Sequence, residues 1–122
     1  MIYNEYRVKF YVDLKRKNSP ILQFIEQLPQ KHQAKILKYI DFLRKHEGVL
    51  DEPYAKHIKG KIRELRVDFG RNRYRIFYFV FIQKTIVMLH GFLKRTTQTP
   101  PSEIRIAEER HQNVINHQSF YV

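Results

Sequence analysis

The chain has 122 residues and contains no cysteine, which excludes disulfide bonds and thiol catalysis. Apolar residues make up 43% of the sequence, including eight tyrosines and nine phenylalanines, so a packed core is expected and wholesale disorder is excluded. The formal net charge of +11 suits a polyanionic partner, of which nucleic acid is the commonest.

The N-terminal part predicts one strand and one helix. Apolar and polar residues alternate from Tyr6 to Asp13, a pattern typical of a strand with one buried face. Ser19-Pro20 is a typical helix start, with serine as the N-cap and proline at the first helical position. Apolar residues then recur at helical spacing from Ile21 to Leu28, so a helix is expected up to Pro29.

A second helix is predicted directly after Pro29. Its expected apolar stripe consists of Ala34, Leu37, Ile40 and Leu43. Gly48 is well suited to the position just past its C-terminus. Because the break between the two helices is so short, we expect them to form an antiparallel pair.

Three strands and a last helix are predicted in the remainder. Residues 49–60 are expected to form an irregular connection, followed by strands over 62–69, 73–82 and 85–93. The second half of strand 73–82 is apolar on both faces, which predicts a central strand covered from both sides. Pro100-Pro101 is compatible only with a helix beginning, so a helix is expected to follow.

These elements define an α+β fold of order β-α-α-β-β-β-α, with a small antiparallel sheet, two N-terminal helices and a C-terminal helix. One domain over 1–122 is expected, with a flexible tail from about residue 116. The longest apolar run, 76–82, is too short to span a bilayer, and charged residues interrupt the apolar positions near the N-terminus. A cytoplasmic protein without a membrane segment is therefore expected.

Positive charge is concentrated in the middle of the chain. The net charge is +5 over residues 1–50, +7 over 51–98 and −1 over 99–122. Arg73 and Arg75 share one strand face, and a two-residue turn at Gly70-Arg71 would place Arg66 directly opposite Arg75, whereas a three-residue turn would shift the pairing. Like charges in that position destabilise a sheet. We therefore expect compensation from Glu64 and Asp68, as a salt-bridged surface patch or together with a bound anion.

Lys94 and Arg95 follow the strand predicted over 85–93. They extend the cluster of Arg66, Arg73 and Arg75 if the hairpin between strands 73–82 and 85–93 places Lys94 on the same face as these arginines. By alternation, Lys94 shares a face with His90, Met88 and Ile86. His90 lies inside a strand, where a packed and hydrogen-bonded histidine is favoured over a proton carrier. The spacing of the other histidines indicates no metal site.

Residues 62–110, "IRELRVDFGRNRYRIFYFVFIQKTIVMLHGFLKRTTQTPPSEIRIAEER", resemble the C-terminal half of HigB-type toxins in the RelE/ParE superfamily. More narrowly, they resemble its phage-derived, Gp-type branch. The combination of ELR, YRIFY, HGFLKR and TPPSEI carries the resemblance, which extends more loosely over the N-terminal strand and helix pair. It implies a RelE-like fold.

The resemblance also implies site residues. Arg66 of "ELR" and Arg75 of "YRI" match basic active-site positions, and Lys94 or Arg95 of "FLKR" matches the basic pair after the last strand. The expected catalytic residues are therefore Arg66, Arg73, Arg75 and Lys94. The expected RNA- or ribosome-binding residues are Lys59, Lys61, Arg63, Arg71, Arg95, Lys31, Lys35 and Lys38. Lys31, Lys35 and Lys38 recur on one helical face, and the alternative for these three is a solvated stripe without an RNA contact. Ile62 and Glu64 stand where the family pattern has lysines, so the general acid and base stay open.

The function expected from this resemblance is that of a type II toxin–antitoxin toxin which cuts mRNA on the ribosome. RNA supplies its own 2′-hydroxyl nucleophile, so the reaction needs no metal or cofactor and leaves a 2′,3′-cyclic phosphate. The expected partners are a HigA-like helix-turn-helix antitoxin, the ribosome and mRNA. Two alternatives are a ParE-like gyrase poison without catalysis and a basic, nucleic-acid-binding phage accessory protein. The arginine cluster disfavours the gyrase poison, which needs no phosphate pocket.

Overall fold

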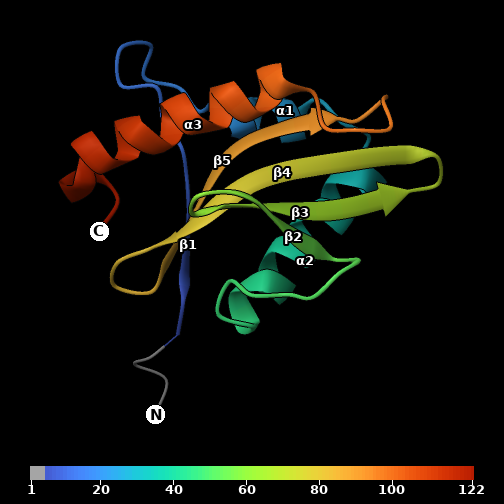
Figure 1. The fold of residues 1–122 in the computed structure, drawn as a ribbon, viewed down its shortest axis with the longest axis horizontal. Helices are drawn as coiled ribbons and strands as arrows, with labels where there is room; N and C mark the ends of the chain where they lie inside the picture. Colours follow the sequence, from blue (N-terminus) through green and yellow to red (C-terminus); the bar gives the residue numbers. More distant parts are fainter. Residues whose placement is uncertain (1–4) are drawn as a thin grey trace.

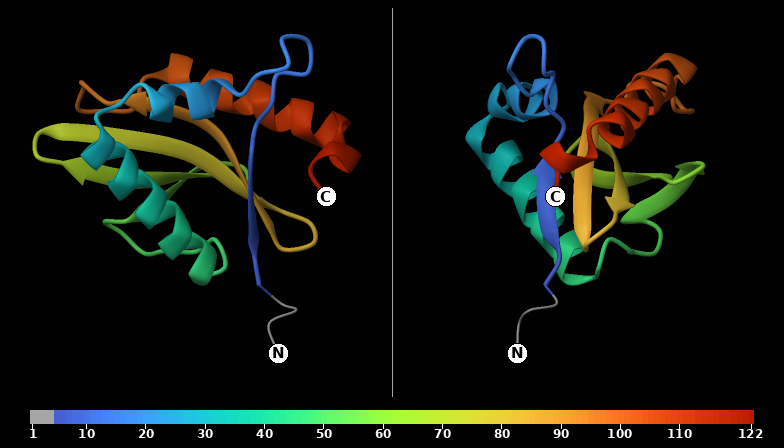
Figure 2. Two further views of the ribbon diagram at one scale, coloured as in Figure 1. Left: turned by 180° about the vertical axis from the view of Figure 1, so that it is seen from behind. Right: turned by 90° about the vertical axis from the view of Figure 1, so that its left-hand side faces the viewer.

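The computed structural model describes residues 5–122 as a five-stranded sheet with helices on both faces. The elements are β1 (Arg7–Phe10), α1 (Pro20–Glu26), α2 (Gln30–Lys45), β2 (Ala55–Lys59), β3 (Ile62–Phe69), β4 (Asn72–Phe81), β5 (Thr85–Leu93), α3 (Pro101–Asn116) and a 3₁₀ turn at Gln118–Phe120. Helices α1 and α2 cover one face of the sheet, and α3 crosses the other (Figures 1 and 2). The predicted α+β class is confirmed. Within residues 5–122, no helix has the length and apolar character needed to cross a membrane.

The sheet is mixed, in the strand order β1-β5-β4-β3-β2. Strands β3, β4 and β5 pair antiparallel with one another, as predicted, and β2 pairs antiparallel with β3. Strand β1 instead pairs with β5 in parallel, from Arg7 opposite Thr85 to Phe10 opposite Met88. The expectation of a purely antiparallel sheet is wrong at this edge because only consecutive strands joined by a hairpin must run antiparallel. Most of the chain separates β1 from β5.

Strand β2 was not expected, since residues 49–60 have no alternating apolar pattern. In the structure, residues 55–59 pair antiparallel with β3 at the edge of the sheet. Of its side chains only that of Ala55 is buried, whereas Lys56, His57 and Lys59 are exposed. Charged side chains are common on edge strands, where they discourage further strand pairing. The same charges conceal the strand in the sequence.

Strand β4 is buried on both faces, as predicted. Phe77 and Phe79 are covered on the side of α3, where the Phe79 ring contacts His111. Ile76 and Tyr78 face α1 and α2, and the Tyr78 hydroxyl donates to the backbone oxygen of Gly48 at 3.0 Å. This hydrogen bond satisfies a buried hydroxyl and ties the end of α2 to the centre of the sheet.

The helix boundaries follow the predicted caps, but the buried stripe of α2 differs. The Ser19 hydroxyl accepts from Leu22 N, as expected of an N-cap. Helix α2 buries Ile36, Ile40 and Leu43, whereas Leu37 is 48% exposed. The predicted stripe through Ala34 and Leu37 is therefore wrong. The buried residues follow an i, i+4, i+7 spacing and form one face of the helix. Leu37 directly follows Ile36 and therefore lies about 100° around the helix from it.

The C-terminal residues fold back onto the domain. Tyr121 is only 1% exposed, and Val12 N donates to its hydroxyl at 3.0 Å. The expectation of a flexible tail from about residue 116 is therefore wrong for this segment. The ring supplies apolar area for burial, and the hydroxyl finds a backbone partner, so ordering the last turn is favourable.

Replacing Gly48 with alanine is expected to lower the free energy of unfolding by about 2–4 kcal/mol. Gly48 has a φ of +81°, and a Cβ there would lie 2.4 Å from Cγ2 of Val80. Urea denaturation measures the loss. Gly60→Ala is the matched control, because Gly60 also has positive φ but faces open space. Its expected loss is about 1 kcal/mol; equal losses for both variants would contradict the predicted clash.

Candidate active site

The hairpin between β3 and β4 brings the predicted arginines onto one face of the sheet. Its turn consists of two residues, Gly70 and Arg71, so that Phe69 pairs with Asn72 and Arg66 pairs with Arg75. Gly70 has a φ of +60°. This is the conformation that a tight hairpin requires at its first turn residue, and glycine adopts it without strain. Of the two registers that the sequence left open, the structure has the two-residue one.

The hairpin between β4 and β5 adds Lys94 to the same face. Arg75 pairs with Phe92, and Lys94 N donates to Arg73 O at 2.8 Å, so Lys94 lies beside Arg73. The register shifts between Phe77 and Tyr78, which pair with His90 and Met88 respectively. Because of this bulge, the face predicted to run from Lys94 through His90 to Met88 and Ile86 is interrupted. Met88 and Ile86 lie on the opposite face.

Two carboxylates compensate part of the positive charge. Glu64 is fully buried, pairs with Arg66 Nε at 3.0 Å and accepts a hydrogen bond from Thr99 Oγ1 at 3.2 Å. Asp68 pairs with Arg75 Nη1 at 2.8 Å, and the same nitrogen donates to Tyr74 O at 3.0 Å. These contacts hold Arg66 and Arg75 in fixed orientations despite their like charges. The predicted compensation by Glu64 and Asp68 is confirmed.

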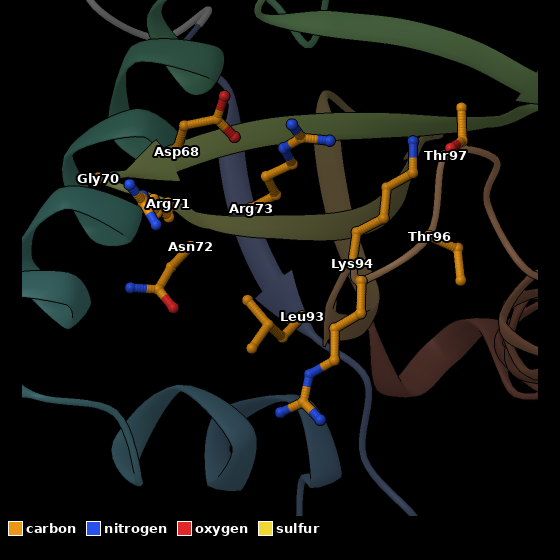
Figure 3. A pocket seen from close by; sticks show the side chains of 10 residues that line it. Asp68, Gly70, Arg71, Asn72, Arg73, Leu93, Lys94, Thr96 and Thr97 are labelled. Carbon is orange, nitrogen blue, oxygen red and sulfur yellow. The ribbon is translucent and has the colours of Figure 1, made fainter.

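An open hollow of about 910 Å³ lies between the β3–β4 hairpin and the loop that follows β5. Asp68, Arg73 and Lys94 lie on the same side of the strands, whereas Asn72 and Leu93 point the other way (Figure 3). Arg71 and Arg95 also line the hollow. Its walls therefore offer several cationic groups to a ligand that enters from solvent.

The ammonium group of Lys94 is perturbed by this environment. Burial lowers the pKa of Lys94, and Arg75, Arg66 and Arg73 lower it further, while Glu64 raises it in part. Burial and like charges both disfavour the protonated form of an amine. The sequence suggested this depression through Arg95. In the structure it comes instead from burial and from the three arginines on β3 and β4. Lys94 therefore exchanges a proton closer to neutral pH than an ordinary lysine.

His90 is packed and hydrogen-bonded, as predicted for a histidine inside a strand. Its Nε2 lies 2.9 Å from Glu103 Oε1, and its ring contacts those of Phe77 and Phe92. Burial lowers the pKa of His90, although the hydrogen bond to Glu103 raises it in part and the nearby Arg110 lowers it further. His90 thus joins α3 to the sheet next to the arginine cluster.

Stability is expected to decrease as the pH falls below about 6.5, in part through His90. Because the pKa of His90 is lower in the fold than in the unfolded chain, its contribution is fully present above the unfolded value. Acidification toward the folded value then removes it, by at most about 1.4 kcal/mol per pH unit. Urea denaturation between pH 7 and pH 5 measures the slope. The slope should be smaller in His90→Gln, although His111, whose pKa is lowered by burial and by Lys61, still contributes; an unchanged slope would contradict this role.

The structure does not bring all the predicted basic residues to this hollow. The β3–β4 hairpin, which carries Arg66, Arg73 and Arg75, is called the arginine hairpin below. Lys59 pairs with Glu108 at 2.9 Å, and Lys61 lies in the adjoining turn, at the end of β3 away from the arginine hairpin. Arg63 pairs with Tyr78 in the sheet and so lies on the opposite face from Arg66. Lys59, Lys61 and Arg63 were predicted to bind RNA, but the structure places them away from the Arg66 side of the sheet or on its other face.

The three predicted lysines of α2 belong to a helix that covers the opposite face of the sheet from Arg66, Arg73 and Arg75. Lys31 is exposed. Lys35 donates to the backbone oxygen of Asp68 and packs over the rings of Tyr39 and Phe69. Lys38 lines a separate groove together with Tyr39 and Phe42. Only Lys35 therefore contacts the arginine hairpin directly.

Two features of the site were missed from the sequence. Thr99 anchors the loop after β5 onto Glu64, and the preceding Thr96 and Thr97 line the hollow. The sequence has only polar residues between Arg95 and Pro100, and nothing in it indicates that this loop folds over Glu64. Tyr54, which lies beside Arg66 and Arg75, fell in a connection without a recognisable pattern. Among residues 5–122, no group of three or more histidine or acidic side chains is arranged to hold a metal ion.

Comparisons with known proteins add the family and the fold. Residues 23–112 match the family described as "Phage derived protein Gp49-like (DUF891)". No curated protein matches the sequence. The free-state structure of an arginine-to-alanine double mutant of the E. coli toxin RelE aligns with a TM-score of 0.59 at 13% identity, over 87% of this chain and 97% of that one. The archaeal RelE–RelB complex from Pyrococcus horikoshii OT3 aligns with a TM-score of 0.50 at 25% identity, over 73% of this chain and 94% of that one.

Proposed function

Because the chain belongs to the family of phage-derived Gp49-like proteins and has the RelE fold, we propose that it is the toxin of a type II toxin–antitoxin pair. More specifically, we propose a HigB-type endoribonuclease that cuts mRNA on the ribosome. Such a toxin acts in the cytoplasm, and we assign this activity to a single domain over residues 1–122. The RelE structures support the fold, and the chemistry of the arginine face supports the activity.

The observation that carries the proposal is the convergence of four cationic side chains on one face of the sheet, next to an open hollow that two of them line. Arg73 and Lys94 line it, and the electrostatic influence of Arg66 and Arg75 extends to Lys94. Guanidinium groups bind phosphate oxygens through two parallel hydrogen bonds and stay charged at all physiological pH values. The hollow therefore fits a phosphodiester together with part of its two flanking nucleotides.

The proposed reaction is an attack by the 2′-oxygen of the substrate on the adjacent phosphorus. A bond forms between the 2′-oxygen and phosphorus, the bond from phosphorus to the 5′-oxygen breaks, and a 2′,3′-cyclic phosphate remains. The 2′-hydroxyl loses a proton, and the departing 5′-oxygen gains one. Arg73 stabilises the additional negative charge on the phosphorane, and the positive charges of Arg66 and Arg75 on the same face add to this stabilisation. Lys94 takes part in proton transfer because its pKa is lowered.

The proposed partners follow from the same fold. The archaeal neighbour was solved as a complex of RelE with RelB, which supports an antitoxin as a partner for this chain. We propose a HigA-like helix-turn-helix antitoxin encoded by the neighbouring gene. The exposed Lys31 and Lys38 are proposed to contact RNA backbone phosphates, since lysines bind these without reading the sequence, and Lys31 is assigned to ribosomal RNA.

The experiment is to express the chain alone and to map transcript 5′ ends in translating and non-translating extracts. The proposal predicts new ends only where the message is being translated, with a cyclic phosphate on the upstream fragment. Breaks of equal frequency without translation would contradict ribosome dependence. Intact message combined with growth arrest would indicate a gyrase poison. RNA binding without breaks or growth arrest would indicate a non-catalytic nucleic-acid-binding protein.

A further inference from the structure

A groove of about 350 Å³ lies on the exposed side of α2. The rings of Tyr39, Phe42 and Tyr54 form its apolar part, and Phe42 and Tyr54 are 41% and 45% exposed. The Phe42 and Tyr54 rings meet edge to face with centroids 6.3 Å apart. Aromatic rings with so much exposed surface are suited to contact with another molecule.

The groove is continuous with the arginine hairpin. Tyr39 and Tyr54 also line a hollow of about 210 Å³, whose other walls include Arg66, Asp68 and Arg75. Asp68 in turn lines the larger hollow that contains Arg73 and Lys94. Shared lining residues therefore connect three neighbouring hollows, from the proposed scissile phosphate, past the edge of β3, to the aromatic groove on α2.

The backbone fixes this connection. Strand β2 pairs with β3 only as far as Ala55 opposite Leu65, and beyond that point Arg66 N donates to Tyr54 O at 2.8 Å. This hydrogen bond places Tyr54 next to Arg66 in the sheet. The exposed ring of Tyr54 therefore keeps a constant position relative to the arginine cluster.

The charges along this path favour an anionic strand. The two smaller hollows are lined by five cationic side chains and two carboxylates. Of these, Lys45 pairs with Asp41, Arg75 pairs with Asp68 and Arg66 pairs with Glu64, while none of the carboxylates in residues 5–122 forms an ion pair with Lys38. Cationic groups that alternate with exposed aromatic rings are typical of single-stranded nucleic-acid sites, in which phosphates contact the cations and bases stack on the rings.

We propose that the α2 groove binds a base of single-stranded RNA, stacked on the ring of Tyr54 with its edge against Phe42 and with its backbone phosphate near Lys38. This inference rests on the proposed function for the identity of the strand, and it extends the substrate site past the scissile phosphate. The groove thereby contributes affinity and positions the strand, whereas the arginine hairpin holds the reacting group.

Fluorescence provides a direct test, because the chain contains no tryptophan. Tyr54→Trp introduces one reporter into the groove, and the probe is a short single-stranded RNA with 2′-O-methyl groups, which cannot be cleaved by its own 2′-oxygen. Stacking of a base should quench the tryptophan emission in a saturable manner. Phe120→Trp is the control, because Phe120 is also an exposed aromatic residue, at 54%, but lies in the 3₁₀ turn after α3. Its emission should not change.

Affinity measurements by fluorescence anisotropy of the labelled RNA complete the test. Tyr54→Ser should weaken binding about tenfold without a change in salt dependence, because a stacking contact is lost and no phosphate contact. Lys38→Gln should instead reduce the salt slope by about one. Phe120→Ser should bind as the wild type does. Affinity unchanged in Tyr54→Ser, or quenching by the antitoxin but not by RNA, would overturn the proposal.

These outcomes are separate from those of the proposed function. Stacking without cleavage in a translating extract would overturn the nuclease proposal and leave the groove assignment standing. Cleavage by a protein whose groove does not respond to RNA would do the reverse.

Discussion

Glutamine in place of Lys94 is expected to slow mRNA cleavage about 100- to 10,000-fold, with little change in stability. Lys94 lines the open hollow, and burial together with three nearby guanidinium groups lowers its pKa. Glutamine keeps much of the length of the side chain but cannot transfer a proton. The cleavage rate is measured on a single message in a translating extract.

Two further variants identify what Lys94 contributes. Lys94→Arg retains the charge but does not titrate near neutral pH, so it should remain nearly as slow as Lys94→Gln. Lys15→Gln removes an exposed lysine from the loop between β1 and α1 and should cleave at the wild-type rate. If Lys94→Arg restores cleavage, Lys94 acts only as a positive charge, and proton transfer must be assigned to another group.

Glutamine in place of Arg73 is expected to slow cleavage about 100- to 1,000-fold, as is typical when one donor to a developing anion is removed. Arg73 is exposed, lines the same hollow as Lys94 and lies opposite Asp68 in the register of the hairpin. Because Arg73 is not part of the core, thermal unfolding should be nearly unchanged. The rate assay used for Lys94 also measures this variant.

Arg16→Gln is the matched control for Arg73. Arg16 is also exposed, but it lies in the loop between β1 and α1, at the opposite end of the molecule from the β3–β4 hairpin (Figures 1 and 2). Both variants remove one positive charge, so a general loss of attraction to RNA would slow both equally. A loss confined to Arg73→Gln supports a specific contact with the phosphodiester.

The predicted meander was accurate where local patterns determine the structure. Alternation in 62–69 and 73–82, combined with glycine at position 70, predicted the hairpin and left two registers open, of which the structure has the one that pairs Arg66 with Arg75. The cap at Ser19 and the glycine at position 48 were recognisable because their backbone roles depend on neighbouring residues.

Other features depend on tertiary contacts that no local pattern encodes. The direction of β1 is set by packing against β5, and the bulge in the second hairpin redirects Met88 without a sequence signal. The carboxylate of Glu64 is buried because Thr99 and the loop after β5 fold over it, and alternation alone assigned it to a polar face. The α2 groove combines rings from two separate segments, so it was recognisable only in the folded chain.

The account depends on Arg73 and Lys94 acting on the same phosphodiester, and a double-mutant cycle tests this directly. Cleavage rates are compared among the wild type, Arg73→Gln, Lys94→Gln and the double variant in one translating extract. Groups that act on one transition state are strongly coupled, so the double variant should be little slower than the slower single variant. Two losses that multiply in full, or single variants that cleave at the wild-type rate, would contradict a shared site.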